Sequence, residues 1–301
     1  MNQAKVLNFF GLLLIMFGMS FALPLFVAIL YGESLIKVFG LGMSILVLMG
    51  FLSWFFTKDN KQELSLSDGF VITVLFWIVL SVSGSIPFIL FGFGVVDSFF
   101  ESMSGITTTG ATVIAGLDDL PKSLLIYRQL LQWLGGMGLI VLAIAVMPLL
   151  GIGGGQLFKT QTPGPMSEQR LTPRITSTAR ALWSIYFVLT VLCIFAYRLA
   201  GMSYFDAVSH AFSTVSIGGF STHDLSIGFF DSLSIEIVCI TFMLLSAMSF
   251  AVHYSAIYRK QVLKYFYDPE LRFFVSLLIV ILGLVCPVSY THLRAHETPR
   301  Y

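Results

Sequence analysis

Long stretches without any charged residue alternate with short polar segments along this chain. Seven such stretches contain no Asp, Glu, Lys or Arg: 6–32, 38–57, 69–96, 129–158, 181–197, 237–258 and 273–293. A helix that crosses a bilayer needs roughly 20 apolar residues, and most of these stretches reach or nearly reach that length. The first stretch is longer than the apolar core of a signal peptide, so we interpret it as a retained helix. The pattern predicts an all-α integral membrane protein.

The composition agrees with this pattern. Hydrophobic residues make up 56% of the chain and charged residues only 11%, whereas a soluble domain has about 25% charged residues. We therefore expect the folded chain to lie in a lipid bilayer. We expect no nucleic acid partner.

The basic residues are distributed unevenly between the two sides that seven crossings would create. With the N-terminus inside, eleven basic residues fall inside: Lys5, Lys58, Lys61, Lys159, Arg170, Arg174, Arg180, Arg259, Lys260, Lys264 and Arg272. Four fall outside: Lys37, Lys122, Arg128 and Arg198. This bias follows the positive-inside rule and predicts a cytoplasmic N-terminus.

The outer side collects acidic residues instead. They are Glu33, Asp97, Glu101, Asp118, Asp119, Asp206, Asp224, Asp231 and Glu236. An acidic outer mouth would concentrate cations. Ordinary solvated loops explain part of this set equally well.

A short segment occurs twice, at an offset of 109 residues. "DSFFESMSGITTTGA" (97–111) aligns without a gap on "DAVSHAFSTVSIGGF" (206–220). Each copy follows one apolar stretch and precedes another, at 69–96 and 125–150 for the first copy and at 181–200 and 232–258 for the second. The repeated unit is therefore a helix, a half-length segment, a strip rich in Gly, Thr and Ser, and a second helix.

The half-length segment and its strip together suggest a cation site. Ten residues from Asp97 or Asp206 form about 15 Å of helix, half of a bilayer core of about 30 Å. We expect each Asp to cap its helix, whose negative carbonyl end then lies at mid-membrane and favours a cation. Non-helical backbone at that depth must be buried or line an aqueous path, where its carbonyls can coordinate an ion. A single strip could equally be a helix-packing motif, but two strips in register favour a filter.

These residues resemble a known family. "STVSIGGFSTHD" (213–224) and the segment "WLGGMGLIVLAIAVMPLLGIGGGQLFKTQTPGPMSEQRLTPRITSTARALW" (133–183) are similar to the TrkH/TrkG membrane subunits of Trk-type bacterial potassium uptake systems, within the Trk/Ktr/HKT superfamily. The resemblance covers residues 1–286 and implies an N-terminal two-helix domain followed by helix–pore loop–helix repeats in a pseudo-fourfold arrangement. The implied parts are the N-terminal domain (1–60), the first repeat (68–152), a cytoplasmic linker (153–180), the second repeat (181–262) and the start of a third (270–286).

The resemblance also implies the site and its partners. Potassium would be the transported ion, and no covalently bound cofactor is implied. Its ligands would be the backbone carbonyls of Thr108, Thr109, Ile217 and Gly218, and Gly110 and Gly219 would let each strip turn. The implied partners are a cytosolic nucleotide-binding regulatory subunit of the TrkA type and, for the full-length form, a second copy in a homodimer. The implied location is the bacterial inner membrane.

The last residues depart from the family pattern. "PVSYTHLRAHETPRY" (287–301) carries two histidines and two arginines where apolar helix should continue. We expect this tail to be non-native, and a chain with two of four filter strips to be a fragment that does not conduct alone.

Other functions are less well supported. "GIGGGQLFKT" (151–160) lacks the Gly-Lys-Ser/Thr ending of a phosphate loop, and the histidines lack the H-E-x-x-H spacing of a zinc protease, so we do not expect an enzyme. Two alternatives remain: a broken-helix secondary transporter of a small organic substrate, and a membrane scaffold that does not transport.

Overall fold

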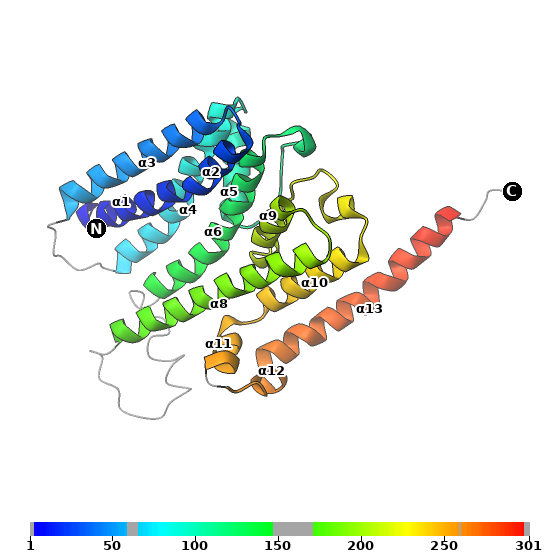
Figure 1. The fold of residues 1–301 in the computed structure, drawn as a ribbon. Helices are drawn as coiled ribbons and strands as arrows, with labels where there is room; N and C mark the ends of the chain where they lie inside the picture. The colour runs from blue at the N-terminus through cyan, green and yellow to red at the C-terminus, as the bar shows by residue number, and fades with distance from the viewer. Residues whose placement is uncertain (1–2, 59–65, 147–170, 259, 298–301) are drawn as a thin grey trace. The chain divides into compact units, whose positions relative to one another are not determined.

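The computed structural model describes residues 3–58, 66–146, 171–258 and 260–297, and every regular element among them is helical (Figure 1). The chain divides into two compact units, Met1–Ser246 and Ala247–Tyr301. The predicted all-α architecture is therefore confirmed for the described residues.

The first unit contains most of the helices. They are α1 (Gln3–Ser20), α2 (Ala22–Tyr31), α3 (Ile36–Thr57), α4 (Leu66–Phe91), α5 (Val95–Ile106), α6 (Lys122–Val146), α8 (Leu171–Leu199), α9 (Tyr204–Val215) and α10 (Leu233–Ala247), with short 3-10 helices η1 (Leu117–Asp119) and η3 (Ser226–Phe230). The second unit contains α11 (Phe250–Tyr258), α12 (Lys264–Tyr267) and α13 (Pro269–Glu297).

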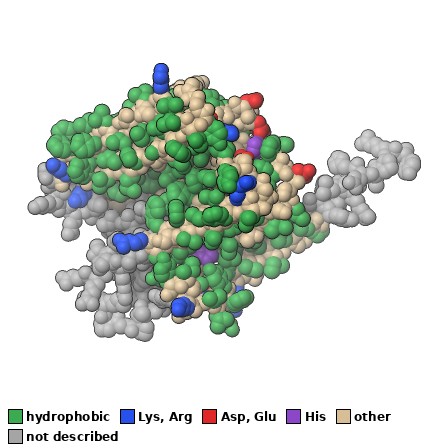
Figure 2. Space-filling model, in the orientation of Figure 1, with side chains coloured by type: hydrophobic (Ala, Val, Ile, Leu, Met, Phe, Trp, Pro, Cys, Tyr) green, Lys and Arg blue, Asp and Glu red, His purple; other side chains and the backbone are tan. Residues whose placement is uncertain are grey.

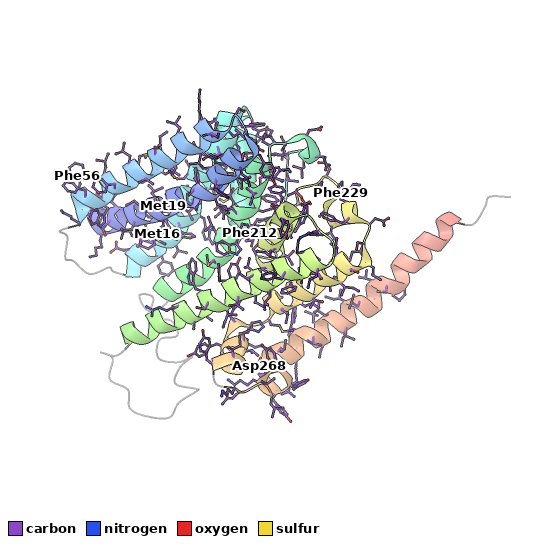
Figure 3. All side chains as sticks on the ribbon, viewed as in Figure 1. Met16, Met19, Phe56, Phe212, Phe229 and Asp268 are labelled. Carbon is purple, nitrogen blue, oxygen red and sulfur yellow. The ribbon has the colours of Figure 1, made fainter. Side chains whose placement is uncertain are left out.

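Five helical segments are long and apolar enough to cross a membrane. They are Gln3–Tyr31, Ile36–Thr57, Asp68–Phe91, Arg180–Leu199 and Pro269–Pro287. Helix α6 has 25 residues, which is also enough for a bilayer core of about 30 Å. Hydrophobic side chains cover much of the visible face in Figure 2, and Met16, Met19 and Phe56 are more than half exposed on α1 and α3 (Figure 3). Such faces suit contact with lipid.

The N-terminal helices pack closely on each other and on the rest of the first unit. A Cβ added to Gly11 of α1 would lie 2.8 Å from the carbonyl oxygen of Gly50 of α3, so only glycine allows this approach. Phe21, Phe39 and Tyr127 form an edge-to-face aromatic cluster with ring centroids 5.2–6.3 Å apart. This cluster attaches the N-terminal helices to α6, which carries much of the candidate site.

The helices differ in extent from the predicted segments at three places. The linker predicted to end at residue 180 is helical from Leu171 onward, because α8 extends beyond the apolar stretch. The predicted spanning stretch 237–258 is interrupted: α10 ends at Ala247 and α11 begins at Phe250. The amides of Val252 and His253 both donate to the carbonyl of Ser249, at 2.9 and 3.4 Å, and thereby begin a new helical turn.

The third difference lies in the second unit. The helix predicted for 270–286 continues through Pro287 to Glu297 as α13. Residues 287–297 are therefore helical. Within this unit, His253 Nδ1 of α11 is 2.7 Å from the hydroxyl of Tyr265 of α12.

Candidate functional site

Two short helices of equal length repeat at the offset found in the sequence. Helix α5 (Val95–Ile106) and helix α9 (Tyr204–Val215) have 12 residues each, and both of their ends differ by 109 positions. Twelve residues form about 18 Å of helix, still well short of a bilayer core of about 30 Å. Helix α5 contacts α4 and α6, and helix α9 contacts α8 and α6. The predicted half-length segments are therefore present.

The predicted aspartate caps are wrong. The N-cap residues are Gly94 and Ser203, whereas Asp97 and Asp206 lie in the first turn of their helices. Ser203 Oγ accepts a hydrogen bond from the amide of Asp206 at 3.1 Å and donates one to its carboxylate at 2.7 Å. Both carboxylates still lie near the positive end of a helix dipole, where a negative charge is favourable.

The strips that follow these helices share one backbone conformation. The φ angles of Thr108 and Ile217 are 55° and 56°, and those of Gly110 and Gly219 are 77° and 85°. Each strip begins with an amide that returns to its helix: Thr109 N donates to Ser104 O at 2.9 Å, and Gly218 N donates to Ser213 O at 2.8 Å. The register predicted from the sequence therefore extends to the backbone angles.

The two strips approach each other, and most of their carbonyls are not engaged. A Cβ added to Gly110 would lie 2.1 Å from the oxygen of Gly218. Among the hydrogen bonds of the described residues, none ends on the carbonyl of Thr108, Thr109 or Ile217. The carbonyl of Gly218 differs, because it accepts a hydrogen bond from Gln132 Nε2 at 2.7 Å.

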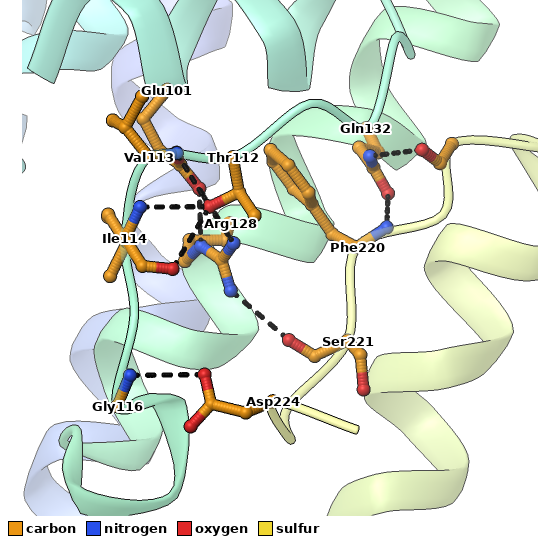
Figure 4. A network of polar contacts seen from close by, with 11 residues as sticks. Glu101, Thr112, Val113, Ile114, Gly116, Arg128, Gln132, Phe220, Ser221 and Asp224 are labelled. Carbon is orange, nitrogen blue, oxygen red and sulfur yellow. Dashed lines mark hydrogen bonds and ion pairs between the residues drawn. The ribbon is translucent and has the colours of Figure 1, made fainter. Parts of the chain in front are cut away.

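A buried ion pair lies behind the first strip (Figure 4). Arg128 Nη2 of α6 is 2.6 Å from Glu101 Oε1 of α5, and both side chains have no exposed surface. The Glu101 carboxylate also accepts hydrogen bonds from the hydroxyl of Thr112 at 3.0 Å and from the amide of Val113 at 3.2 Å. The carboxylate thereby fixes the end of the first strip to its own short helix.

The same arginine also reaches the second strip. Arg128 Nη1 donates to the carbonyl of Ser221 at 3.1 Å, and its guanidinium lies 4.5 Å from the ring centroid of Phe220. The sequence counted Arg128 and Glu101 among the charged residues on the outer side of the membrane, without predicting that they contact each other. In the structure the pair is buried, and Arg128 connects the two repeats.

The second repeat has a counterpart of the Glu101–Thr112 contact. His210 and Ser221 occupy the positions that correspond to Glu101 and Thr112, and His210 Nε2 is 2.9 Å from Ser221 Oγ. The ring of His210 is only 1% exposed. His210 therefore lies buried behind its strip.

The outer loops of the two repeats are joined by acidic side chains. The carboxylate of Asp224 accepts hydrogen bonds from the amides of Gly116 and Leu117, both at 3.0 Å. The imidazole of His223 contacts the carboxylate of Asp118, and this hydrogen bond lowers the pKa of Asp118. Part of the predicted acidic mouth therefore holds the loops together.

The groups that remain available to bind a ligand at this site are backbone carbonyl oxygens. Carbonyls released by left-handed residues lie at the negative ends of two short helices, an arrangement suited to a cation without its water shell. Among the described residues no group of His, Cys, Asp or Glu could hold a resident metal ion. The fold and site thus define a helical membrane protein in which two short helices are each followed by a strip of backbone carbonyls.

The comparisons with known proteins identify the family within this class. A family model named TrkH, described as "Cation transport protein", matches residues 35–293. The chain belongs to this family, which consists of transport proteins and not of enzymes. The match continues to residue 293, past residue 286, where the resemblance was expected to stop. The protein is a multi-pass protein of the cytoplasmic membrane.

Individual relatives agree with this assignment. The Trk system potassium uptake protein TrkH of Halomonas elongata is 49% identical over 96% of this chain, and TrkG of Escherichia coli is 44% identical over 93%. The crystal structure of the potassium transporter TrkH from Vibrio parahaemolyticus matches 99% of this chain with a TM-score of 0.86 and 45% identity. The chain spans about 60% of the length of these relatives.

Two residues of the site were missed in the sequence, Arg128 and Gln132. Both are polar side chains with no exposed surface on α6, in or beside an apolar stretch. A polar residue at membrane depth is itself a functional signal and could have identified them.

Proposed function

We propose that this chain forms part of the potassium path of a Trk-type uptake system. The ion would be coordinated by the carbonyls of Thr108, Thr109, Ile217 and Gly218, with Gly110 and Gly219 as the turning points. The observation that carries the proposal is the matched pair of strips, in which three of these four carbonyl oxygens accept no hydrogen bond among the described residues. The named activity of the relatives, potassium uptake, supports the choice of ion.

The proposal includes the domain organisation and partners implied by the family. The repeats would be 68–152 and 181–262, after an N-terminal domain at 1–60, with a third repeat that begins near residue 270. The relatives are named as parts of a system, which supports a partner subunit. We propose a cytosolic nucleotide-binding regulator of the TrkA type as this partner, and a homodimer for the full-length form.

The test uses a chimera, because the chain spans about 60% of its relatives. Residues 1–286 are joined to the part of Halomonas elongata TrkH that this chain does not cover. We expect the chimera to restore growth of a potassium-uptake-deficient bacterium at low potassium and to take up rubidium. The 301-residue chain alone should do neither, because two strips supply half of a fourfold site. A chimera that inserts normally but takes up no rubidium would contradict the proposal.

The same assay separates the alternatives. A broken-helix secondary transporter would exchange an organic substrate without taking up rubidium, and a scaffold would do neither. The interruption between α10 and α11 alone does not favour the secondary transporter, since the relatives are named as potassium uptake proteins.

A further inference from the structure

Gln132 of α6 contacts the second strip at two points (Figure 4). Its side chain has no exposed surface. Nε2 donates a hydrogen bond to the carbonyl of Gly218 at 2.7 Å, and Oε1 accepts one from the amide of Phe220 at 3.1 Å. The donor and the acceptor of one side-chain amide are therefore both used on the same strip.

The two hydrogen bonds lie on either side of Gly219. This residue has a φ of 85°, and its neighbours Gly218 and Phe220 are buried. The Gln132 amide thus pairs with the strip as a neighbouring backbone would, and it holds the left-handed turn from both sides. Without it, a buried carbonyl and a buried amide would both lose their partner, which is unfavourable.

The first strip has no equivalent contact among the described residues. The carbonyl of Thr109, which corresponds to that of Gly218, accepts no hydrogen bond there. On α10 the position that corresponds to Gln132 is Thr241, but α10 is not among the helices that pack on α5. Among the described residues, Gln132 therefore contacts the second strip and not the first.

We infer that Gln132 is a positioning residue that contributes to ion specificity by fixing the carbonyl of Gly218. This inference rests on the proposed function, since it concerns the same ion path. In the cavity-size account of ion selectivity, a carbonyl that is held in place cannot move inward to coordinate a smaller ion, so the fixed strip favours potassium over sodium. Arg128, one helical turn before Gln132, donates a hydrogen bond to the carbonyl of Ser221 in the next part of the strip. Both residues that hold the second strip therefore lie on α6.

The helix supplies a matched control. Gln129 lies on α6 three residues before Gln132 and also has no exposed surface. Its side-chain nitrogen and oxygen have no hydrogen-bond partner among the described residues. Gln129→Met therefore changes the same residue type at the same burial without removing a contact to the strip.

The experiment compares Gln132→Met and Gln129→Met in the chimera. We expect the ratio of rubidium to sodium uptake to fall about tenfold in Gln132→Met, as the loss of a buried hydrogen-bonded contact predicts, and to stay unchanged in Gln129→Met. Amide hydrogen exchange of the peptide that covers Gly218–Phe220 should become faster in Gln132→Met only. This second readout does not depend on transport.

The outcomes separate the inference from the proposed function. An unchanged uptake ratio in Gln132→Met, with an active wild type, overturns the specificity role of Gln132. Equal uptake ratios in the two variants, both lower than in the wild type, also overturn it, because the effect would then come from general disturbance of α6. A wild-type chimera that takes up no rubidium overturns the proposed function, and the specificity role with it. Unchanged amide exchange in Gln132→Met overturns the positioning role in either case.

Discussion

Thr108 and Ile217, which lie 109 positions apart, adopt the same left-handed backbone conformation, with φ angles of 55° and 56°. Neither residue is glycine, and Ile217 is β-branched, so this conformation costs roughly 1–2 kcal/mol at each position. Each is held by a short helix on one side and a left-handed glycine two residues later on the other. Strain that recurs at two matched positions indicates that the backbone shape itself is what the strips provide.

The glycines of the strips should tolerate alanine to different degrees. At Gly110 a Cβ would lie 2.1 Å from the carbonyl oxygen of Gly218, whereas at Gly219 nothing lies within 4 Å and only the positive φ opposes a side chain. We expect Gly110→Ala to lower the initial rate of rubidium uptake by the chimera by about tenfold or more. Gly219→Ala should lower it less, through a backbone cost of about 1 kcal/mol.

The control for this comparison is Gly228→Ala. Gly228 has no positive φ and no neighbour within 4 Å of an added Cβ, and it lies in an outer 3-10 helix. Its uptake rate should match that of the wild type. Equal rates for Gly110→Ala and Gly228→Ala, at equal amounts of folded protein, would contradict the assignment of Gly110 to the ion path.

The repeat could be predicted from the sequence because it is carried by local features. The composition of each short segment, the spacing of its glycines and the flanking apolar stretches all recur at one offset, so α5 and α9 were expected where they are found. The caps were not predicted correctly, because Asp97 and Asp206 are favourable both at a cap and in the first turn. The sequence does not distinguish positions that differ by one turn and have the same charge preference.

The contacts between the repeats could not be predicted. Arg128 and Gln132 act on residues about 90 positions away, and their effect depends on how α6 packs against α9. Neither side chain belongs to a motif with a recognisable spacing. The interruption after Ala247 was missed for a similar reason, since no proline or charged residue marks it.

The topology can be tested by labelling single cysteines with a membrane-impermeant reagent. The native Cys193, Cys239 and Cys286 are first replaced by alanine. Asp119→Cys, on an exposed outer loop, should react from outside intact cells, whereas Lys58→Cys should react only after the membrane is opened. Lys159→Cys, which lies outside the described residues, should behave like Lys58→Cys. Labelling of Lys159→Cys in intact cells would contradict the prediction that the linker is cytoplasmic.

Glu33 should stabilise the start of α6. Its carboxylate accepts hydrogen bonds from the amide of Lys122 at 2.7 Å and from the amide of Ser123 at 3.1 Å, so it caps the helix that carries Arg128 and Gln132. Glu33→Gln presents an amide nitrogen to one of these donors and removes the charge from the positive end of the helix. We expect a loss of about 1 kcal/mol in the free energy of unfolding.

This effect can be measured as a shift of the thermal midpoint of the purified protein in detergent. Asp119→Asn is the control, because Asp119 is exposed and also lies outside the membrane stretches. A midpoint for Glu33→Gln no lower than that of Asp119→Asn would show that the cap contributes nothing measurable.

The buried pair of Arg128 and Glu101 should behave as one unit. Removing one member leaves the other charge buried without its partner, which typically costs 3–5 kcal/mol, whereas removing both charges costs much less than the two single changes together. We therefore expect Arg128→Met and Glu101→Gln each to lower the free energy of unfolding by about 3–5 kcal/mol, and the double variant to lose clearly less than their sum.

Arg198→Met is the matched control, since Arg198 lies near the outer loop and contacts the carbonyl of Met202 and the ring of Tyr204. Its loss in the free energy of unfolding should stay below about 1 kcal/mol. The measurement is denaturant unfolding of all five proteins in the same detergent. The double variant should remain impaired in rubidium uptake even where it is stable, because the carbonyl of Ser221 still lacks its donor. If the loss of unfolding free energy in the double variant equals the sum of the two single losses, the two charges are not coupled. The connection between the repeats would then have to be assigned to other contacts.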